Sequence, residues 1–211
     1  TQNQALSALL FLYGKVLRRG IGWVKDVVRA RHGRRLPVVL SRDEVRKILE
    51  QLQGTQRLIA TVMYGAGLRV LECLRLRVKD IDFGRNQIVI RQGKGRKDRI
   101  TMLPGAVQQP LARHLAITRN LHERDLRRGA GRALLPDALA RKYPNADRSW
   151  AWQHVFPASR LTIERKTGLP FRHHLHESVL QRAVHRAVLA SGIPKRASCH
   201  TFRHTFATHL L

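Results

Sequence analysis

The most informative stretch of the chain is GLRVLE, at Gly67–Glu72, and it is completed far along the sequence by HTFRH, at His200–His204. Between them lies QGKGRKDR, at Gln92–Arg99, whose glycines and charges are typical of a turn between two strands. Together the three stretches offer arginine, lysine and histidine side chains. Such a set can hold a phosphodiester through a pentacoordinate transition state without a metal, because phosphoryl transfer depends mainly on positioning and charge stabilisation.

The charge balance points to a polyanionic partner. The 211 residues include 40 Lys and Arg against 14 Asp and Glu, a formal net charge of +26. With 43% hydrophobic residues the chain can bury a core, so it is not a disordered basic tail. Nucleic acid is the commonest partner of so basic a domain. The alternative is a solvated basic face with no partner.

The remaining bulk features concern the cellular compartment and the chain ends. Cys73 and Cys199 form no disulfide framework, which favours a reducing compartment, and no run of 18 apolar residues is present. We therefore expect a cytoplasmic location and no membrane association. The chain begins at Thr1 inside a helical apolar pattern and stops within another, so we expect both ends to be cut.

The apolar spacing and the turn residues predict a mainly α-helical α+β fold. Ser41 and Glu44 have the spacing of a capping box at the start of one helix, and Ser198 is expected to cap the last. Other helices are expected over about 56–64, 69–76, 106–127 and 177–191. Short alternating runs at 80–83, 86–92 and 99–104, separated by turn residues, predict a three-stranded antiparallel meander.

A family resemblance follows from three motifs in their order along the chain. GLR-x-x-E, a lysine in a glycine-flanked β turn, and H-x-x-R-H-[ST]-x-A-[ST] resemble the tyrosine site-specific recombinases. The resemblance covers residues 37–211 and implies that they form the catalytic domain. It further implies that residues 1–20 are the last helix of a core-binding domain. Residues 21–36 are then a basic linker, which either follows a phosphate backbone or is merely solvated.

The resemblance implies a role for each matching position. Arg69 and Arg203 would hold the nonbridging oxygens of the scissile phosphate, for which the planar guanidinium is suited. Lys94 would protonate or stabilise the leaving 5′ oxygen, and His200 would share proton transfer with the attacking hydroxyl or brace the phosphate. Glu72 is expected to be structural. Neither a metal nor a cofactor is expected.

A second set of positions is expected to contact DNA. Lys97, within the turn that carries Lys94, and Arg99, just after it, are two of them. Lys94 has close rivals for its role in Arg96, Lys97 and Arg99, so its assignment rests on the family's position. Residues 128–176 resemble the extra segment of integron integrases, which helps to hold bases flipped out of a folded single-stranded site. Aromatic and imidazole faces suit this task because stacking on unpaired bases demands little sequence specificity. The candidates are Trp150, Trp152, His173 and His174. The alternative is that the tryptophans fill the core of the insertion.

The nucleophile of the family is a tyrosine downstream of H-x-x-R, and none of Tyr13, Tyr64 and Tyr143 occupies that position. We therefore expect the C-terminal nucleophile segment to be missing and this chain to bind DNA without cleaving it. The full-length protein would form a 3′-phosphotyrosyl intermediate and act as a homotetramer. The resemblance implies integration and excision of gene cassettes between an attachment-site duplex and folded single-stranded cassette sites.

Two other classes of protein remain open. The first is a DNA-binding fragment or decoy of a recombinase, without catalysis. The second is a metal-dependent nuclease, since His200 and His204 have an i,i+4 spacing that can bind zinc. Against the nuclease, position 201 is threonine where the HExxH motif needs an acid, and acidic residues are scarce.

Overall fold

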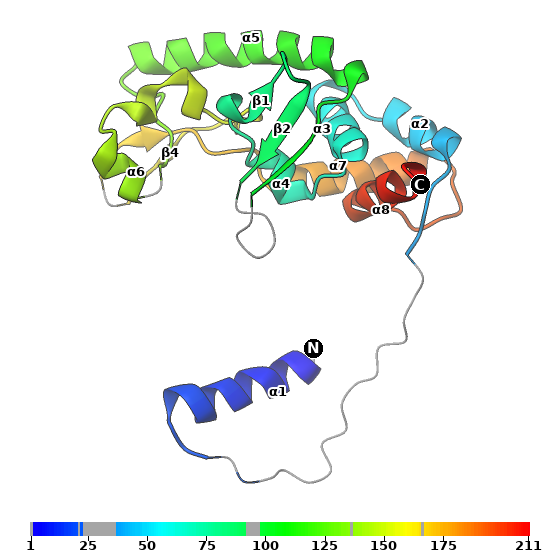
Figure 1. The fold of residues 1–211 in the computed structure, drawn as a ribbon, viewed down its shortest axis with the longest axis horizontal. Helices are drawn as coiled ribbons and strands as arrows, with labels where there is room; N and C mark the ends of the chain where they lie inside the picture. The colour runs from blue at the N-terminus through cyan, green and yellow to red at the C-terminus, as the bar shows by residue number, and fades with distance from the viewer. Residues whose placement is uncertain (1, 21, 23–36, 92–97, 136, 166) are drawn as a thin grey trace. The chain divides into compact units, whose positions relative to one another are not determined.

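The computed structural model describes residues 2–20, 22, 37–91, 98–135, 137–165 and 167–211 (Figure 1). The chain divides into two compact units, Thr1–Leu36 and Pro37–Leu211. In the first unit, α1 (Gln2–Phe11) continues into a π-helical stretch at Leu12–Val16. Apart from residue 22, the expected linker at 21–36 lies outside the described residues.

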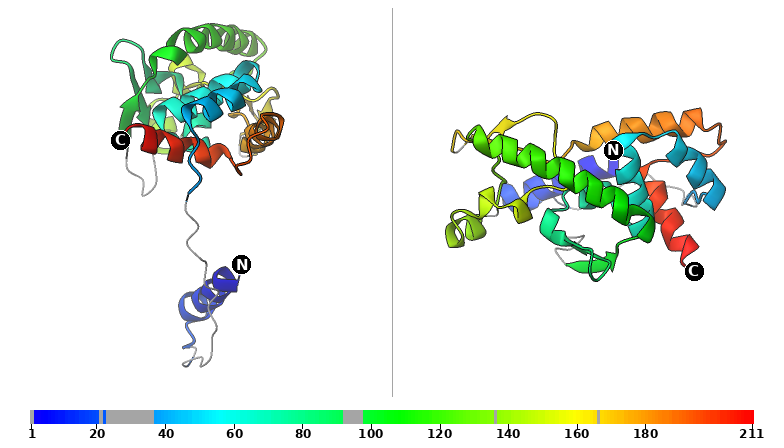
Figure 2. Two further views of the ribbon diagram at one scale, coloured as in Figure 1. Left: turned by 90° about the vertical axis from the view of Figure 1, so that its right-hand side faces the viewer. Right: turned by 90° about the horizontal axis from the view of Figure 1, so that it is seen from above.

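The second unit is built around α3 (Gly54–Ala66). Because α3 buries side chains on several of its sides, other elements pack around it: α2 (Arg42–Glu50), α4 (Val70–Leu74), α7 (Glu177–Ala190) and α8 (Cys199–His209). Figure 2 shows α8 lying beside α3. The expected capping box of α2 is confirmed, with Ser41 Oγ accepting from the Glu44 amide at 3.2 Å.

The expected antiparallel meander is confirmed. Its strands are β1 (Ile81–Asp82), β2 (Gln87–Ile90) and β3 (Arg99–Met102), in that order across the sheet. Ile88 and Ile90 of β2 are buried in the core, whereas β3 is anchored by polar side chains: Thr101 Oγ1 donates to the Ala66 carbonyl at 3.0 Å. Residues 92–97, between β2 and β3, lie outside the described residues, and with them Lys94 and Lys97.

The long helix α5 (Gly105–Arg127) runs along one side of the sheet, at the top of Figure 1. It leads into residues 128–176, which contain α6 (Asp137–Lys142), two 3₁₀ turns, and the strand pair β4 (Thr162–Ile163) and β5 (Pro170–Phe171). The sequence did not predict this pair. Asp125, near the end of α5, accepts two hydrogen bonds from Arg172, at 2.6 and 3.0 Å. These bonds join the C-terminal part of the segment 128–176 to α5.

The segment 128–176 is fixed to the rest of the second unit by backbone and side-chain hydrogen bonds. The Arg77 guanidinium donates to the carbonyls of Trp152, at 2.5 Å, and Leu134, at 2.8 Å. Backbone bonds from Val78 to Gln153 and from Val155 to Leu76 run beside these contacts. The segment is therefore a continuation of the core.

The expected fold class, mainly helical with a small antiparallel sheet, is confirmed. The third helix is shorter than expected, Val70–Leu74 in place of 69–76. Arg69 has extended backbone angles and caps the helix, and the chain turns after Leu74 into a 3₁₀ turn at Val78–Asp80. Within the described ranges, no helix has the length and apolar character needed to cross a bilayer.

Candidate functional site: an arginine cluster opening into a groove

The centre of the site is the carboxylate of Glu72, which binds arginines from three parts of the chain. Its Oε1 accepts from Arg69 Nη1 at 2.7 Å, and its Oε2 accepts from Arg99 Nη2 at 2.6 Å. Oε2 also accepts from the Arg69 backbone amide at 2.9 Å and lies 3.7 Å from Arg203 Nη1. The Glu72 side chain is 9% exposed, and those of the three arginines are 30–38% exposed.

Glu72 remains charged in this environment. Burial would raise the pKa of its carboxyl, but hydrogen bonds from the Arg69 amide, Arg99 and the Arg69 side chain outweigh burial and lower that pKa below its ordinary value. One negative charge thus holds three guanidinium groups. The cluster keeps two positive charges in excess, which suits it to an oxyanion.

Helix α8 brings Arg203 to this cluster. Ser198 caps the helix, as expected, by accepting from the His200 amide at 3.3 Å. Arg203 Nη1 donates to the carbonyl of Gly67, and burial together with the neighbouring Arg69 lowers the pKa of the Arg203 guanidinium. The two sequence motifs, separated by more than a hundred residues, are therefore in direct contact.

His200 is exposed at the start of α8. Its ring lies 4.5 Å from the ring of His204, at an interplanar angle of 88°. Burial, followed by the charges of His204, Arg203 and Arg69, lowers the pKa of His200 below its ordinary value of 6.5. His200 is therefore neutral at pH 7 and can accept a proton.

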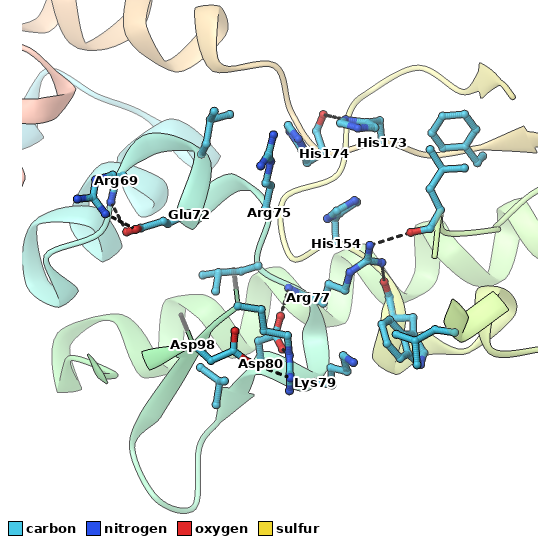
Figure 3. A pocket seen from close by; sticks show the side chains of 18 residues that line it. Arg69, Glu72, Arg75, Arg77, Lys79, Asp80, Asp98, His154, His173 and His174 are labelled. Atoms are coloured by element: carbon cyan, nitrogen blue, oxygen red, sulfur yellow. Dashed lines mark hydrogen bonds and ion pairs between the residues drawn. The ribbon is translucent and has the colours of Figure 1, made fainter. Parts of the chain in front are cut away.

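A groove of about 830 Å³ runs from this cluster to the segment 128–176 (Figure 3). Arg69 and Glu72 line one end, and Trp152, His173 and His174 line the other. Four further basic side chains line it between them: Arg75, Arg77, Lys79 and Arg91. The groove thus places Arg69 and Glu72 on one surface with Trp152, His173 and His174, with basic side chains between them.

The two tryptophans differ in their surroundings. Trp152 lines the groove, and its ring lies 3.0 Å from Lys79 Nζ and 5.4 Å from the Arg77 guanidinium carbon. Trp150 is not among the residues that line the groove, and its ring lies 5.8 Å from that of His122. Of the two tryptophans, Trp152 is therefore the one that lines the groove, with Lys79 over its ring.

The histidines form a cluster of three at the far end of the groove. The rings of His173 and His174 are 4.0 Å apart, and His154 lies within 6 Å of both. Burial and the charge of Arg77 lower the pKa of His154 to about 3, so His154 is neutral at physiological pH. In the part of the chain that the structure describes, no three His, Cys, Asp or Glu side chains are placed to hold a metal ion.

The structure thus brings Arg69, Arg99 and Arg203 together around Glu72. Trp152, His173 and His174 line the groove that begins at Arg69 and Glu72, whereas Arg99, Arg203 and His200 are not among its lining residues. Sequence analysis missed Arg75, Lys79 and His154. Both stretches carried a signal: basic and aliphatic residues alternate in RLRVK at 75–79, and a histidine lies between two aromatic residues in WQHVFP at 152–157. The sequence could not show that these two stretches contact each other. In the structure Arg77 and His154 pair as an isolated antiparallel β-bridge.

The model of the phage integrase family matches residues 38–211 of the chain. The chain therefore belongs to the phage integrase family of tyrosine recombinases. Proteins described as integrase/recombinase in Escherichia coli and Pseudomonas aeruginosa are each 47% identical to it over all 211 residues, which is 63% of their own length. The chain thus spans less than two thirds of these relatives.

Solved structures agree on the fold. The XerH site-specific recombinase in a post-cleavage complex with palindromic difH substrate aligns with a TM-score of 0.59 and 22% identity, over 97% of this chain and 52% of that one. The XerA recombinase aligns with a TM-score of 0.56 and 22% identity, over 98% of this chain and 60% of that one. The fold of residues 37–211 is that of a tyrosine recombinase catalytic domain.

Proposed function

We propose that the protein to which this chain belongs cuts and rejoins DNA strands at specific sites, through a 3′-phosphotyrosyl intermediate. The observation that supports this function is the arginine cluster around Glu72, in which two family motifs meet with excess positive charge. Arg69 and Arg203 would hold the scissile phosphate, and Glu72 would fix their positions. A transition state with growing charge on its oxygens gains most from donors that are already in place.

Proton transfer is proposed for the two remaining positions of the motif set. His200 is neutral and accepts or shares the proton of the attacking hydroxyl. Lys94 would donate a proton to the leaving 5′ oxygen, a role that rests on the family motif alone. Four subunits are proposed to act together on two DNA sites.

We further propose that the protein is of the integron type and recombines gene cassettes. The groove supports this, since it continues from the arginine cluster to Trp152, His173 and His174. An unpaired base could lie on Trp152 while the phosphate of the same strand lies at Arg69. A folded single-stranded cassette site offers such unpaired bases, and an attachment-site duplex would be its recombination partner.

For the chain of residues 1–211 we propose DNA binding without cleavage. None of its tyrosines has the family's position after H-x-x-R, and the hydroxyl of Tyr64 is hydrogen-bonded to His209 Nδ1 at 2.8 Å. With a labelled, nicked, folded single-stranded site we expect a shifted band on a native gel and no adduct on a denaturing gel. A covalent adduct would contradict the absence of a nucleophile, and the lack of any shift would contradict the recombinase function.

The integron-type function predicts a selective effect of Trp152→Ala. Loss of one stacked base should weaken binding to a folded single strand by about 1–3 kcal/mol, which is roughly 5- to 150-fold in affinity. Affinity for a duplex of the same length should change much less. The readout is the ratio of the two affinities, measured by fluorescence anisotropy, with Trp150→Ala as the matched variant. Two results would refute stacking of a base on Trp152. One is an equal loss of affinity for the folded strand and the duplex in Trp152→Ala, and the other is the same change of the affinity ratio in Trp150→Ala.

A further inference from the structure

We propose that Arg75 forms a second phosphate-binding site, in the middle of the groove, for a DNA phosphate two or three nucleotides from the scissile one. This inference rests on the proposed function, in which the groove receives DNA. The ligand is a backbone phosphodiester, so the site contributes to affinity and strand position and does not read sequence.

Among the residues that the structure describes, Arg75 differs from the other basic side chains of the groove because its side chain has no partner. Each of the others binds a group of the protein itself. The pairs are Arg69 with Glu72, Arg77 with the carbonyls of Leu134 and Trp152, Lys79 with the Trp152 ring, and Arg91 with Asp80. The Arg75 guanidinium is exposed and makes no ion pair or hydrogen bond with any other residue that the structure describes.

The carboxylates of the groove do not neutralise Arg75. Glu72 is shared by three other arginines, and Asp80 accepts from Arg91 at 2.8 Å. Asp98 lies 3.8 Å from the same Arg91. The positive charge of Arg75 thus remains available for an external anion.

The backbone of Arg75 is held in place although its side chain is free. Its amide donates to the Leu71 carbonyl at 3.0 Å, and the next residue, Leu76, is buried and accepts from the Val155 amide at 2.9 Å. Figure 3 shows the side chain extending from the end of α4 toward His174. Burial, followed by the charges of His173 and Arg75, lowers the pKa of His174, so a neutral ring forms the wall beside the cation.

The spacing between Arg69 and Arg75 sets the position of the second phosphate. The two residues flank the five-residue helix α4, and the six steps from Arg69 to Arg75 span about 9 Å at the rise of an α-helix. A DNA strand advances about 3.4 Å per nucleotide along the duplex axis, so the same span corresponds to two or three nucleotides. One strand can therefore contact both arginines.

The test compares Arg75→Gln with Arg113→Gln, an exposed arginine of α5 outside the groove lining. The affinity of each chain for a folded single-stranded DNA hairpin is measured at several salt concentrations. Arg75→Gln should reduce the slope of log affinity against log salt by about 0.9, the value for one phosphate contact. Arg113→Gln should leave the slope unchanged, and Arg75→Lys, which keeps the charge, should restore most of it.

Methylphosphonate substitution then locates the contact. Neutralising one phosphate at a time should reveal a position, two or three nucleotides from the nick, that weakens binding of the original chain and has no effect on Arg75→Gln. Suppose that the original chain binds with a clear salt dependence but Arg75→Gln has the same salt slope as Arg113→Gln. The proposal that Arg75 binds a phosphate is then wrong, whereas the proposal of DNA binding stands. If the original chain does not bind the hairpin, the proposed function itself fails.

Discussion

Gly67→Ala is expected to lower the free energy of unfolding by about 3 kcal/mol, the sum of a backbone and a packing cost. Gly67 has a φ of +63°, a left-handed conformation that disfavours alanine by about 1–2 kcal/mol. A Cβ at this position would also lie 2.3 Å from a ring carbon of Phe206, so α3 and α8 would have to move apart. The measurement is urea unfolding followed by circular dichroism.

Gly54→Ala provides the control for the backbone cost. Gly54 has a φ of +52°, but a Cβ there meets no atom within 4 Å. We expect a loss of only about 1 kcal/mol from backbone strain. The difference in unfolding free energy between the two variants therefore measures the cost of the collision with Phe206. Equal losses of unfolding free energy would show that the surrounding structure accommodates the added methyl group without cost. Since Gly67 also accepts from Arg203, DNA affinity should fall with stability in the first variant only.

Glu72→Gln is the second change with a large expected effect. It removes the charge that holds Arg69, Arg99 and Arg203 together and leaves their mutual repulsion uncompensated. Loss of one member of a fully buried pair costs about 3–5 kcal/mol, and because these arginines are about a third exposed we expect about 2 kcal/mol at pH 7. Asp43→Asn, which removes the partner of the exposed Arg46, should cost less than about 0.5 kcal/mol.

The pH dependence distinguishes charge from packing in this comparison. The pKa of Glu72 is lower in the folded protein, so its ionised form stabilises the fold above the ordinary value of 4.5. That contribution is lost as the pH falls through the lower folded pKa. The difference in unfolding free energy between the original chain and Glu72→Gln should accordingly shrink below pH 4.5. A difference that stays constant with pH would show that the carboxylate acts through shape alone.

The sequence predicted those parts of the structure that depend on local pattern. The capping residues Ser41 and Ser198, the meander of short alternating strands, and the meeting of Arg69 with Arg203 all follow from spacing or from the motif set. Arg99 was expected to contact DNA, and the structure adds an ion pair with Glu72 that spacing could not reveal.

The groove could not be predicted because it depends on contacts between distant segments. Trp150 and Trp152 are alike in sequence, yet a 3₁₀ turn places one beside His122 and the other beside Lys79. Similarly, Arg75 and Arg77 look equivalent in RLRVK, and only the docked segment distinguishes a bound guanidinium from a free one.

Arg77 also has an evolutionary consequence. Burial lowers the pKa of its guanidinium, and the carbonyls that satisfy it belong to residues 57 and 75 positions further along the chain. A relative that lost the segment containing Leu134 and Trp152 would leave this cation without acceptors, which is costly for a charge out of water. The arginine and the segment should therefore be inherited as a pair, and relatives with a shorter segment should carry an uncharged residue at this position.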